Sequence, residues 1–133
     1  MERSSGAAPP LQLLTVEVER EDGEASIVSL VGELDLSTIR TAEKPLFGEL
    51  RTHSAVIIDL TRLSFIDSSG IGMLIQGFRA REREETGELH TVIARDSQIE
   101  RVFRLAGIDR ALPLYEDRAA ALAATNGGRL QGD

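Results

Sequence analysis

The hydrophobic pattern of the first half of the chain predicts strands. Residues 14–20 alternate between apolar and polar side chains, which is the period of a strand with one exposed face. Residues 21–24 supply an acidic, glycine-containing turn, and residues 26–31 return as a second strand, so the two predict a hairpin. Residues 55–58 are all apolar and too few for a helix, and they predict a strand that is buried on both faces.

Apolar residues at helical spacing predict one helix before this buried strand and one after it. The first has Ser37 or Thr38 as its N-cap. Pro45 lies inside its apolar stripe and predicts either a kink or a helix that starts near Lys44. The second follows a short turn-like stretch, and Asp67 is its predicted N-cap, so this helix should begin directly after Asp67.

The next part of the chain predicts a further strand and a third helix. The dense mixed charge of residues 79–88 is typical of the solvated end of a helix. Residues 89–94 form the predicted strand. The helix that follows is capped by Asp96 or Ser97 and is stopped by Gly107.

The whole pattern predicts one α/β domain. A short strand near residues 112–115 and an alanine-rich helix over residues 117–124 complete it. An opening hairpin and then alternating strands and helices predict a sandwich, a mixed sheet of about four to five strands with about four helices mainly on one face. We expect residues 12–124 to form this single domain, with residues 1–11 as a disordered leader and residues 125–133 as a flexible tail.

Composition narrows the possible functions. The 133 residues carry a formal net charge of −7, which argues against nucleic acid as a partner, because such proteins gain affinity from a basic surface. The absence of cysteine excludes disulfides, thiol catalysis and cysteine-ligated metals. No stretch approaches the roughly 18 apolar residues of a membrane span, and the N-terminus lacks the apolar core of a signal peptide. The sequence therefore predicts a soluble cytoplasmic protein with no membrane part.

The tetrapeptide Asp-Ser-Ser-Gly at residues 67–70 carries the candidate chemistry. Ser68 and Ser69 fall in the first turn of a predicted helix, where backbone N–H groups lack partners and the helix dipole favours an anion. A phosphate group at this position would be stabilised. Gly70 and Gly72 place no side chains beside these hydroxyls, which leaves room for close approach. The alternative is that the polar residues of the tetrapeptide only cap the helix.

The sequence gives little support for a catalytic site or a cofactor site. A serine nucleophile needs a base, usually histidine, and only His53 and His90 are present, neither with a Gly-x-Ser-x-Gly elbow. Ile75 replaces the third glycine of a dinucleotide fingerprint. Glu33 and Asp35 follow the second strand and could serve acid–base work or bind a cation, but they also suit exposed loop carboxylates or a partner contact. We expect no enzymatic activity, no cofactor and no metal.

Two segments resemble a known family. Residues 59–72, Asp-Leu-Thr-Arg-Leu-Ser-Phe-Ile-Asp-Ser-Ser-Gly-Ile-Gly, are similar to the signature of the STAS-domain anti-sigma factor antagonists of bacteria. Residues 31–35, Val-Gly-Glu-Leu-Asp, are similar to the element before the first helix of that family. The resemblance implies the STAS sandwich. It also implies that the unmodified domain binds an anti-sigma factor, commonly a serine-protein kinase, and thereby frees a sigma factor.

The same resemblance implies a phosphorylation switch. In the family the kinase modifies the second serine of the Asp-Ser-Ser-Gly motif, here Ser69, and a serine phosphatase reverses the change. The residues alone do not choose between Ser68 and Ser69, since adjacent helical positions point about 100° apart. We expect a monomer or weak dimer. The alternative function is a scaffold subunit of a stressosome-like signalling assembly.

The expected partner contacts surround this serine. An exposed Met73 would suit an adaptable apolar contact, although a methionine on a helix is also a common core residue. The full set of expected contact residues is Glu33, Asp35, Ser37, Asp67, Ser68, Ser69, Gly70, Ile71 and Met73.

Overall fold

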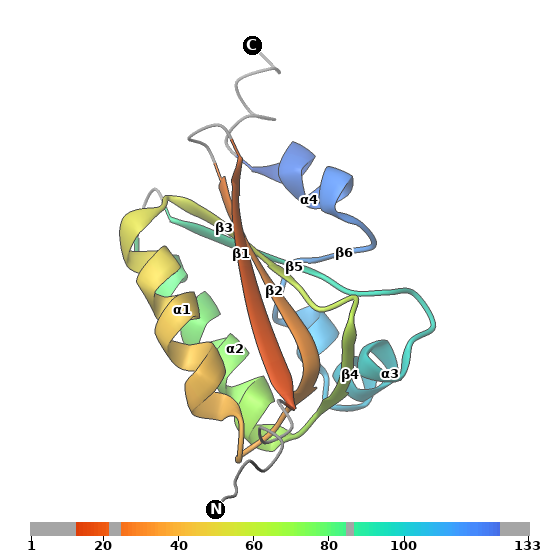
Figure 1. Ribbon diagram of the computed structural model, residues 1–133. Coiled ribbons are helices and arrows are strands. Elements are labelled where there is room, and N and C mark those ends of the chain that lie inside the picture. The colour runs from red at the N-terminus through yellow and green to blue at the C-terminus, as the bar shows by residue number, and fades with distance from the viewer. Residues whose placement is uncertain (1–12, 22–24, 85–86, 126–133) are drawn as a thin grey trace, which may run out of the picture.

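Figure 1 shows the fold in a computed structural model, which describes residues 13–21, 25–84 and 87–125. Within these residues, six strands form one mixed sheet with four α-helices around it. The strands are β1 (Leu14–Glu21), β2 (Ala25–Leu34), β3 (Ala55–Asp59), β4 (Leu63–Ile66), β5 (Glu88–Val92) and β6 (Leu114–Tyr115). The helices are α1 (Ile39–Thr52), α2 (Ser68–Glu82), α3 (Gln98–Leu105) and α4 (Arg118–Ala124), and a 3₁₀ turn, Ile108–Arg110, precedes β6. The expected leader, the centre of the hairpin turn and all of the expected tail except Thr125 lie outside the described residues.

The sheet is built around β2. β1 pairs with β2 in the antiparallel direction, as the predicted hairpin requires, and parallel pairing continues the sheet in the order β1-β2-β3-β5-β6. β4 pairs with the last residues of β2, beyond the part of β2 that pairs with β3. This segment is the turn-like stretch of the sequence analysis. It explains why the described sheet has six strands where about four to five were expected.

A register shift marks the point where β2 meets β4. The shift falls between Gly32 and Glu33. Gly32 has a φ of +115°, and a Cβ at this position would lie 2.2 Å from the carbonyl oxygen of Leu13. Glycine fits this crowded conformation because it has no Cβ. Glu33, which we expected after the strand, lies within β2, and its amide donates to the same Leu13 oxygen at 2.7 Å.

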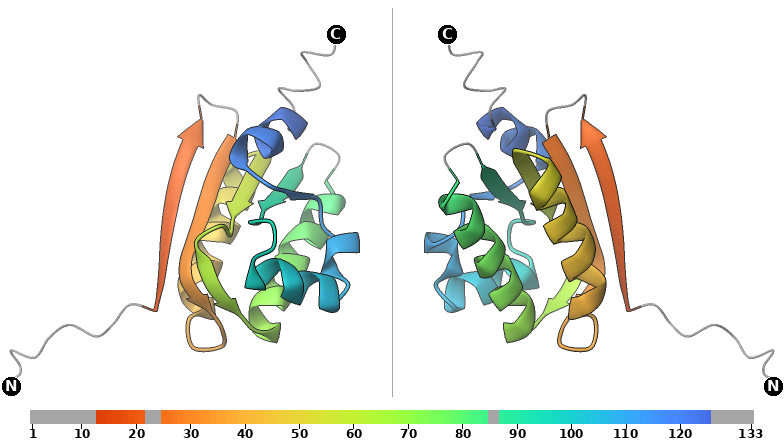
Figure 2. Two further views of the ribbon diagram at one scale, coloured as in Figure 1. Left: turned by 90° about the vertical axis from the view of Figure 1, so that its right-hand side faces the viewer. Right: turned by 90° about the vertical axis from the view of Figure 1, so that its left-hand side faces the viewer.

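Helices cover both faces of the sheet, with the larger layer on one side. α1 and α2 lie side by side on one face, α4 lies on the other face, and α3 packs beside β4 (Figures 1 and 2). Alternate side chains of a strand point to opposite faces, and both faces are apolar in the central strand β3. Val56 and Ile58 belong to the core formed with α1 and α2, whereas Ile57 packs with Ala121 of α4.

Helix α1 begins directly after Thr38, one of its two predicted N-cap residues. It begins at Ile39, so a start near Lys44 is wrong, and Pro45 lies inside the helix. Thr38 occupies the N-cap position but makes no side-chain cap bond. Among the helices of the described residues, none has both the length and the apolar character needed to cross a membrane.

The charged run at residues 79–88 contains a buried arginine. We expected this run to be solvated, but Arg81 is only 4% exposed. Its Nη2 donates to the carbonyl oxygens of Leu50, at 2.6 Å, and His53, and its Nη1 donates to that of Ser54, at 3.3 Å. These oxygens lie at and just after the C-terminal end of α1, where backbone carbonyls lack helical donors. Arg81 of α2 therefore caps α1, and the prediction is wrong at this position.

A buried carboxylate ties α4 to the sheet. Asp59 ends β3, is 6% exposed, and accepts hydrogen bonds from Nε of Arg118 at 2.7 Å and from the hydroxyl of Thr61 at 2.7 Å. Arg118 also donates to the hydroxyl of Ser29 at 2.8 Å. Burial raises the pKa of Asp59, but the hydrogen bonds from Thr61 and Arg118 outweigh it and hold this pKa below its usual value. Asp59, the first residue of the family-like segment 59–72, thus has a structural role.

Candidate functional site at the N-terminus of helix α2

Asp67 organises the start of α2. It is the N-cap residue, and its Oδ1 accepts hydrogen bonds from the amides of Ser69, at 2.9 Å, and Gly70, at 3.2 Å. The hydroxyl of Ser69 donates to the same oxygen at 2.6 Å. These amides belong to the first turn, where backbone donors have no helical acceptor. The predicted N-cap and the predicted start of the helix are both confirmed.

The second carboxylate oxygen of Asp67 reaches the loop between β2 and α1. Its Oδ2 accepts a hydrogen bond from the amide of Leu36 at 3.2 Å. Asp35 holds this loop together, because its Oδ1 accepts from the amide of Ser37 at 2.9 Å, from the Ser37 hydroxyl at 2.7 Å and from the amide of Thr38 at 3.2 Å. One carboxylate therefore joins the start of α2 to a loop that lies about thirty residues earlier in the sequence.

The charge of Asp67 is stabilised by this arrangement. The hydrogen bond from the Ser69 hydroxyl is the largest cause that holds the pKa of Asp67 below its ordinary value. The amides of Gly70, Leu36 and Ser69 lower this pKa further, while partial burial opposes them. Asp67 is consequently ionised at neutral pH, and a negative charge lies beside the candidate phosphate acceptor.

The two serines of the motif differ in exposure and bonding. Ser68 is exposed, and its side chain makes no hydrogen bond to the rest of the described chain. Ser69 is half-buried, and its hydroxyl donates to the N-cap carboxylate. The side chains of His53 and His90 bond to neighbours in their own segments. Neither histidine is therefore paired with a motif serine in the way that a nucleophile requires.

Two of the expected contact residues are buried. Met73 is 3% exposed and belongs to the core formed with α1 and the sheet, so the exposed apolar contact expected there is wrong. At Gly70, an added Cβ would lie 2.8 Å from side-chain carbons of both Leu34 and Ile66. Side chains already fill the space beside Gly70, which is therefore not open to a partner. Gly72, by contrast, faces open space.

The remaining expected residues lie around the loop and the first turn of α2. Asp35 and Ile71 are half-buried and Ser37 is exposed. Glu33 belongs to β2, whereas Asp35 is engaged by the loop, so the two carboxylates have different structural settings. In the described part of the chain, no three His, Asp or Glu side chains are grouped so that they could hold a metal ion.

Sequence reasoning missed two exposed apolar residues near this site. Leu36 is 76% exposed, and its amide is the one that bonds Asp67. Phe65 of β4 is 42% exposed and precedes Asp67 by two residues. Leu36 had a usable signal, because it is a lone apolar side chain between polar residues of a loop. Phe65 had none while β4 was interpreted as a turn.

Comparisons with known proteins find relatives that match almost the whole described domain. Residues 15–121 match the STAS domain family. The anti-sigma-F factor antagonist RsfB of Mycobacterium tuberculosis is 32% identical over 121 aligned residues, which cover 88% of this chain and 93% of RsfB. The crystal structure of an anti-sigma factor antagonist from Mycobacterium paratuberculosis has a TM-score of 0.72 at 29% identity, with 84% of this chain and 93% of that chain covered. The anti-sigma factor antagonist SpoIIAA in its unphosphorylated form has the same fold, with a TM-score of 0.67 at 21% identity over 90% of this chain and 98% of SpoIIAA.

Proposed function

The chain belongs to the STAS-domain family, and from this premise we propose that it is an anti-sigma factor antagonist, a regulator and not an enzyme. RsfB, which is named for that function, aligns with this chain over most of the length of both proteins. In the proposed action, the unmodified protein binds an anti-sigma factor, and the sigma factor held by that partner is released.

The proposed contact surface is the exposed part of the site. Its apolar centre is Leu36, which the Asp67 carboxylate holds in place through the Leu36 amide. The exposed residues Ser37 and Ser68 complete the proposed surface. An exposed leucine in a polar surround is the kind of residue that a partner can bury at the centre of an interface.

Phosphorylation at Ser69 is the proposed off-switch, and the 2.6 Å hydrogen bond from Ser69 to Asp67 is the observation that carries it. A phosphoserine cannot donate this bond, and it adds about −1.5 to −2 charges beside a carboxylate that is already ionised. Asp67 also holds the amide of Leu36, so repulsion at Ser69 acts on the contact loop as well. Ser68 makes no such bond, and its modification would leave this network intact.

The expected size of the switch follows from the cost of a buried charge in an interface. If burial of the new dianion opposes binding by about 2 to 4 kcal/mol, affinity for the anti-sigma factor falls by a factor on the order of 30 to 1,000. The fold should survive the modification, because a helix N-terminus tolerates an anion. We propose that the anti-sigma factor is itself the serine-protein kinase and that a separate serine phosphatase restores the active form.

The experiment compares the wild type with Ser69→Ala and Ser68→Ala after incubation with ATP and host-cell lysate. We expect intact-mass spectrometry to show one added phosphoryl group on the wild type and on Ser68→Ala, and none on Ser69→Ala. The unmodified protein then serves to isolate the kinase. Calorimetry measures the affinity of this kinase for the unmodified and for the phosphorylated protein. A phosphoryl group on Ser68 alone, or equal affinity for both forms, would overturn the switch.

Light scattering of the purified protein tests the scaffold alternative. An antagonist of the proposed kind should be a monomer or weak dimer, whereas a stressosome-like scaffold subunit should form a large assembly with related domains. A large oligomer that no lysate kinase modifies would favour the scaffold.

A further inference from the structure

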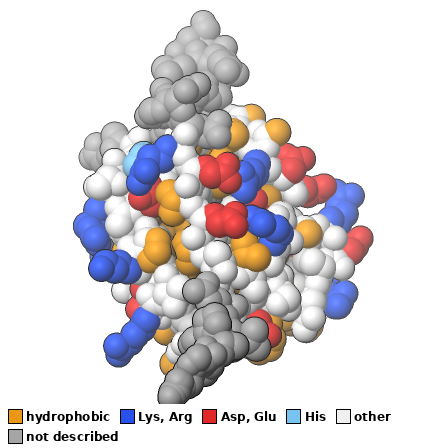
Figure 3. All heavy atoms as spheres, in the orientation of Figure 1, with side chains coloured by type: hydrophobic (Ala, Val, Ile, Leu, Met, Phe, Trp, Pro, Cys, Tyr) orange, Lys and Arg blue, Asp and Glu red, His pale blue; other side chains and the backbone are white. Residues whose placement is uncertain are grey.

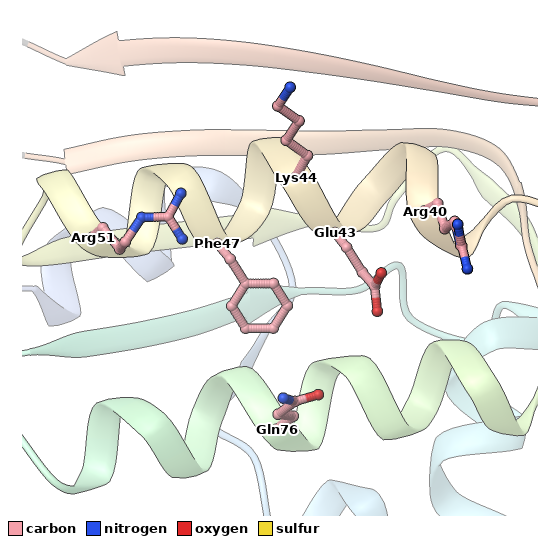
Figure 4. Close-up of a pocket in the computed structure, with 6 residues that line it drawn as sticks. All are labelled: Arg40, Glu43, Lys44, Phe47, Arg51 and Gln76. Atoms are coloured by element: carbon pink, nitrogen blue, oxygen red, sulfur yellow. The ribbon is translucent and has the colours of Figure 1, made fainter.

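Helices α1 and α2 enclose a shallow groove on the outer surface of the molecule. One hollow of about 640 Å³ is lined by Arg40, Glu43, Lys44, Phe47, Arg51 and Gln76 (Figure 4). A second hollow of about 400 Å³ is lined by Gly72, Ile75, Gln76, Arg79 and Arg83. Gln76 lines both, so the two hollows are adjacent, and we refer to them together as the α1–α2 groove.

The groove is formed by one stripe of each helix. On α1 the lining positions 40, 43, 47 and 51 are three or four residues apart, which places them on one face. Figure 4 shows Phe47 and Glu43 pointing into the space between the helices, while Lys44 points away from α2. At a rise of 1.5 Å per residue, the stripe from Arg40 to Arg51 extends for about 16 Å.

The groove gathers cations that have no partner elsewhere in the described structure. Seven described Lys and Arg residues make no ion pair with another described residue, and five of them line the groove. These five are Arg40, Lys44, Arg51, Arg79 and Arg83. Lys and Arg side chains accordingly follow the left edge of Figure 3, over α1. The described residues of a protein with a net charge of −7 therefore include a locally positive surface.

Helix electrostatics account for only part of this cluster. Arg51, Arg79 and Arg83 lie near helix C-termini, where the dipole favours a cation. Arg40 lies in the first turn of α1, where the dipole disfavours it. Its position costs free energy in the isolated protein, and an anionic partner would remove that cost.

The shape and charge of the groove point to a protein segment as its occupant. The hollows are shallow and open, whereas small-molecule sites enclose most of their ligand. A continuous polyanion such as duplex DNA would meet the carboxylate of Glu43 in the groove and the net negative charge of the chain. Separated carboxylates would instead meet the cations at both ends and avoid Glu43.

We propose that the α1–α2 groove binds an acidic segment of a partner protein. The segment presents carboxylates to Arg40 at one end and to Arg51 and Arg79 at the other, with an uncharged side chain over Phe47 between them. This groove is distinct from the proposed contact surface of Leu36, Ser37 and Ser68, and it does not depend on the proposed switch at Ser69. It would give the protein a second site at which a partner can be held.

The probe is a dye-labelled helical peptide of about twelve residues, with glutamates about 16 Å apart and a central leucine. Its binding is followed by fluorescence anisotropy at about 50 mM and about 300 mM salt, because the attraction is screened by ions. We expect binding at low salt that weakens at high salt. In the Arg51→Glu/Arg79→Glu variant, affinity should fall at least about tenfold, with reversal of two cations in the groove.

The matched control is Arg101→Glu/Arg110→Glu, which changes the net charge equally at two cations outside the groove that make no ion pair with another described residue. Its affinity for the peptide should change by less than about twofold, apart from the small effect of overall charge. Circular dichroism checks that both variants are folded. Equal losses in the two variants, or no binding by the wild type, would overturn the proposal.

Two further probes separate the proposed occupant from other anions. The first is a vesicle that contains anionic lipid, and the second is a short DNA duplex. Each is titrated separately under the same low-salt conditions. Binding of either probe more tightly than the peptide, with loss in the groove variant, would assign the groove to a membrane surface or to nucleic acid and overturn the protein partner. Amide shifts in an NMR titration should map peptide binding to residues 40–51 and 72–83, and shifts elsewhere would contradict the site.

Discussion

A side chain at each end of helix α2 bonds to free backbone groups, as an acceptor at the N-terminal end and as a donor at the C-terminal end. At the N-terminal end, Asp67 accepts from the amides of Ser69 and Gly70. At the C-terminal end, Arg81 donates to carbonyl oxygens that include that of Leu50, where α1 finishes. Both side chains satisfy groups that a helix terminus leaves without partners.

The two ends of α2 differ in how far their bonding side chains are buried. Arg81 is 4% exposed and its bond to the carbonyl oxygen of Leu50 is buried, whereas Ser69 is half-buried beside the exposed Ser68. A bond network at the surface can be rearranged by an added phosphate, while a buried one changes only when packing is lost. The same helix thus combines a fixed end, which positions α1, with an end that modification can alter.

Replacement of Arg81 by methionine should give the largest effect. Arg81→Met keeps much of the apolar stem but leaves the carbonyl oxygens of Leu50, His53 and Ser54 without the donors that Arg81 supplies. We expect the free energy of unfolding to fall by about 3 kcal/mol, measured by urea denaturation. Arg83→Met is the control, because Arg83 is exposed, and it should change stability by less than about 0.5 kcal/mol. Similar losses in both variants would mean that Arg81 does not anchor the helix.

Gly70 and Gly72, near the start of α2, should respond in opposite directions to alanine. Gly70→Ala places a Cβ 2.8 Å from Leu34 and Ile66, and we expect a loss of about 1 to 3 kcal/mol from overpacking. Gly72→Ala meets nothing within 4 Å and should gain about 0.5 to 1 kcal/mol, because alanine favours the helix. Thermal unfolding of the two variants measures both signs. A stable Gly70→Ala would show that the modifiable end of α2 is not held against the core.

The same contrast explains how much the sequence could predict. The cap at Asp67 is local, since its donors Ser69 and Gly70 follow within three residues, and the start of α2 was predicted correctly. Arg81 donates to backbone carbonyl oxygens 27 to 31 residues earlier in the chain. Every residue has such an oxygen, so the sequence does not indicate which of them will be an acceptor. The charge of Arg81 indicated solvent, and only tertiary packing overrides that indication.

Strand β4 and the exposure of individual residues were harder to predict for a related reason. β4 has four residues and its pairing with β2 is interrupted by a register shift, so no local period marks it. Helical spacing placed Met73 on α2 but did not decide which face α2 turns to the sheet, and that face buries Met73. The Leu36 amide donates to Asp67 across 31 residues of sequence. Because this bond is not local, the sequence predicted Asp67 as the cap of α2 but not as a partner of the loop that contains Leu36.

The smallest predicted effect concerns the proton of Asp67. The Ser69 hydroxyl is the largest cause that lowers the pKa of this carboxyl, so Ser69→Ala should raise that pKa toward its ordinary value. Ser68→Ala is the matched control and should leave it unchanged, because the Ser68 side chain makes no bond to Asp67. Carbon-detected NMR titration of the Asp67 carboxyl measures both variants.

The sign of the pH dependence follows from this direction. A carboxyl whose pKa is lower in the folded protein adds stability above the unfolded pKa of about 3.9, and this stability is lost as pH falls through the folded value. Ser69→Ala should therefore reduce stability at neutral pH and narrow its difference from the wild type in acid. Equal pKa values of Asp67 in Ser69→Ala and the wild type would show that the Ser69 hydroxyl does not stabilise the carboxylate. Phosphorylation at Ser69 would then have no hydrogen bond to break, and its effect would rest on charge alone.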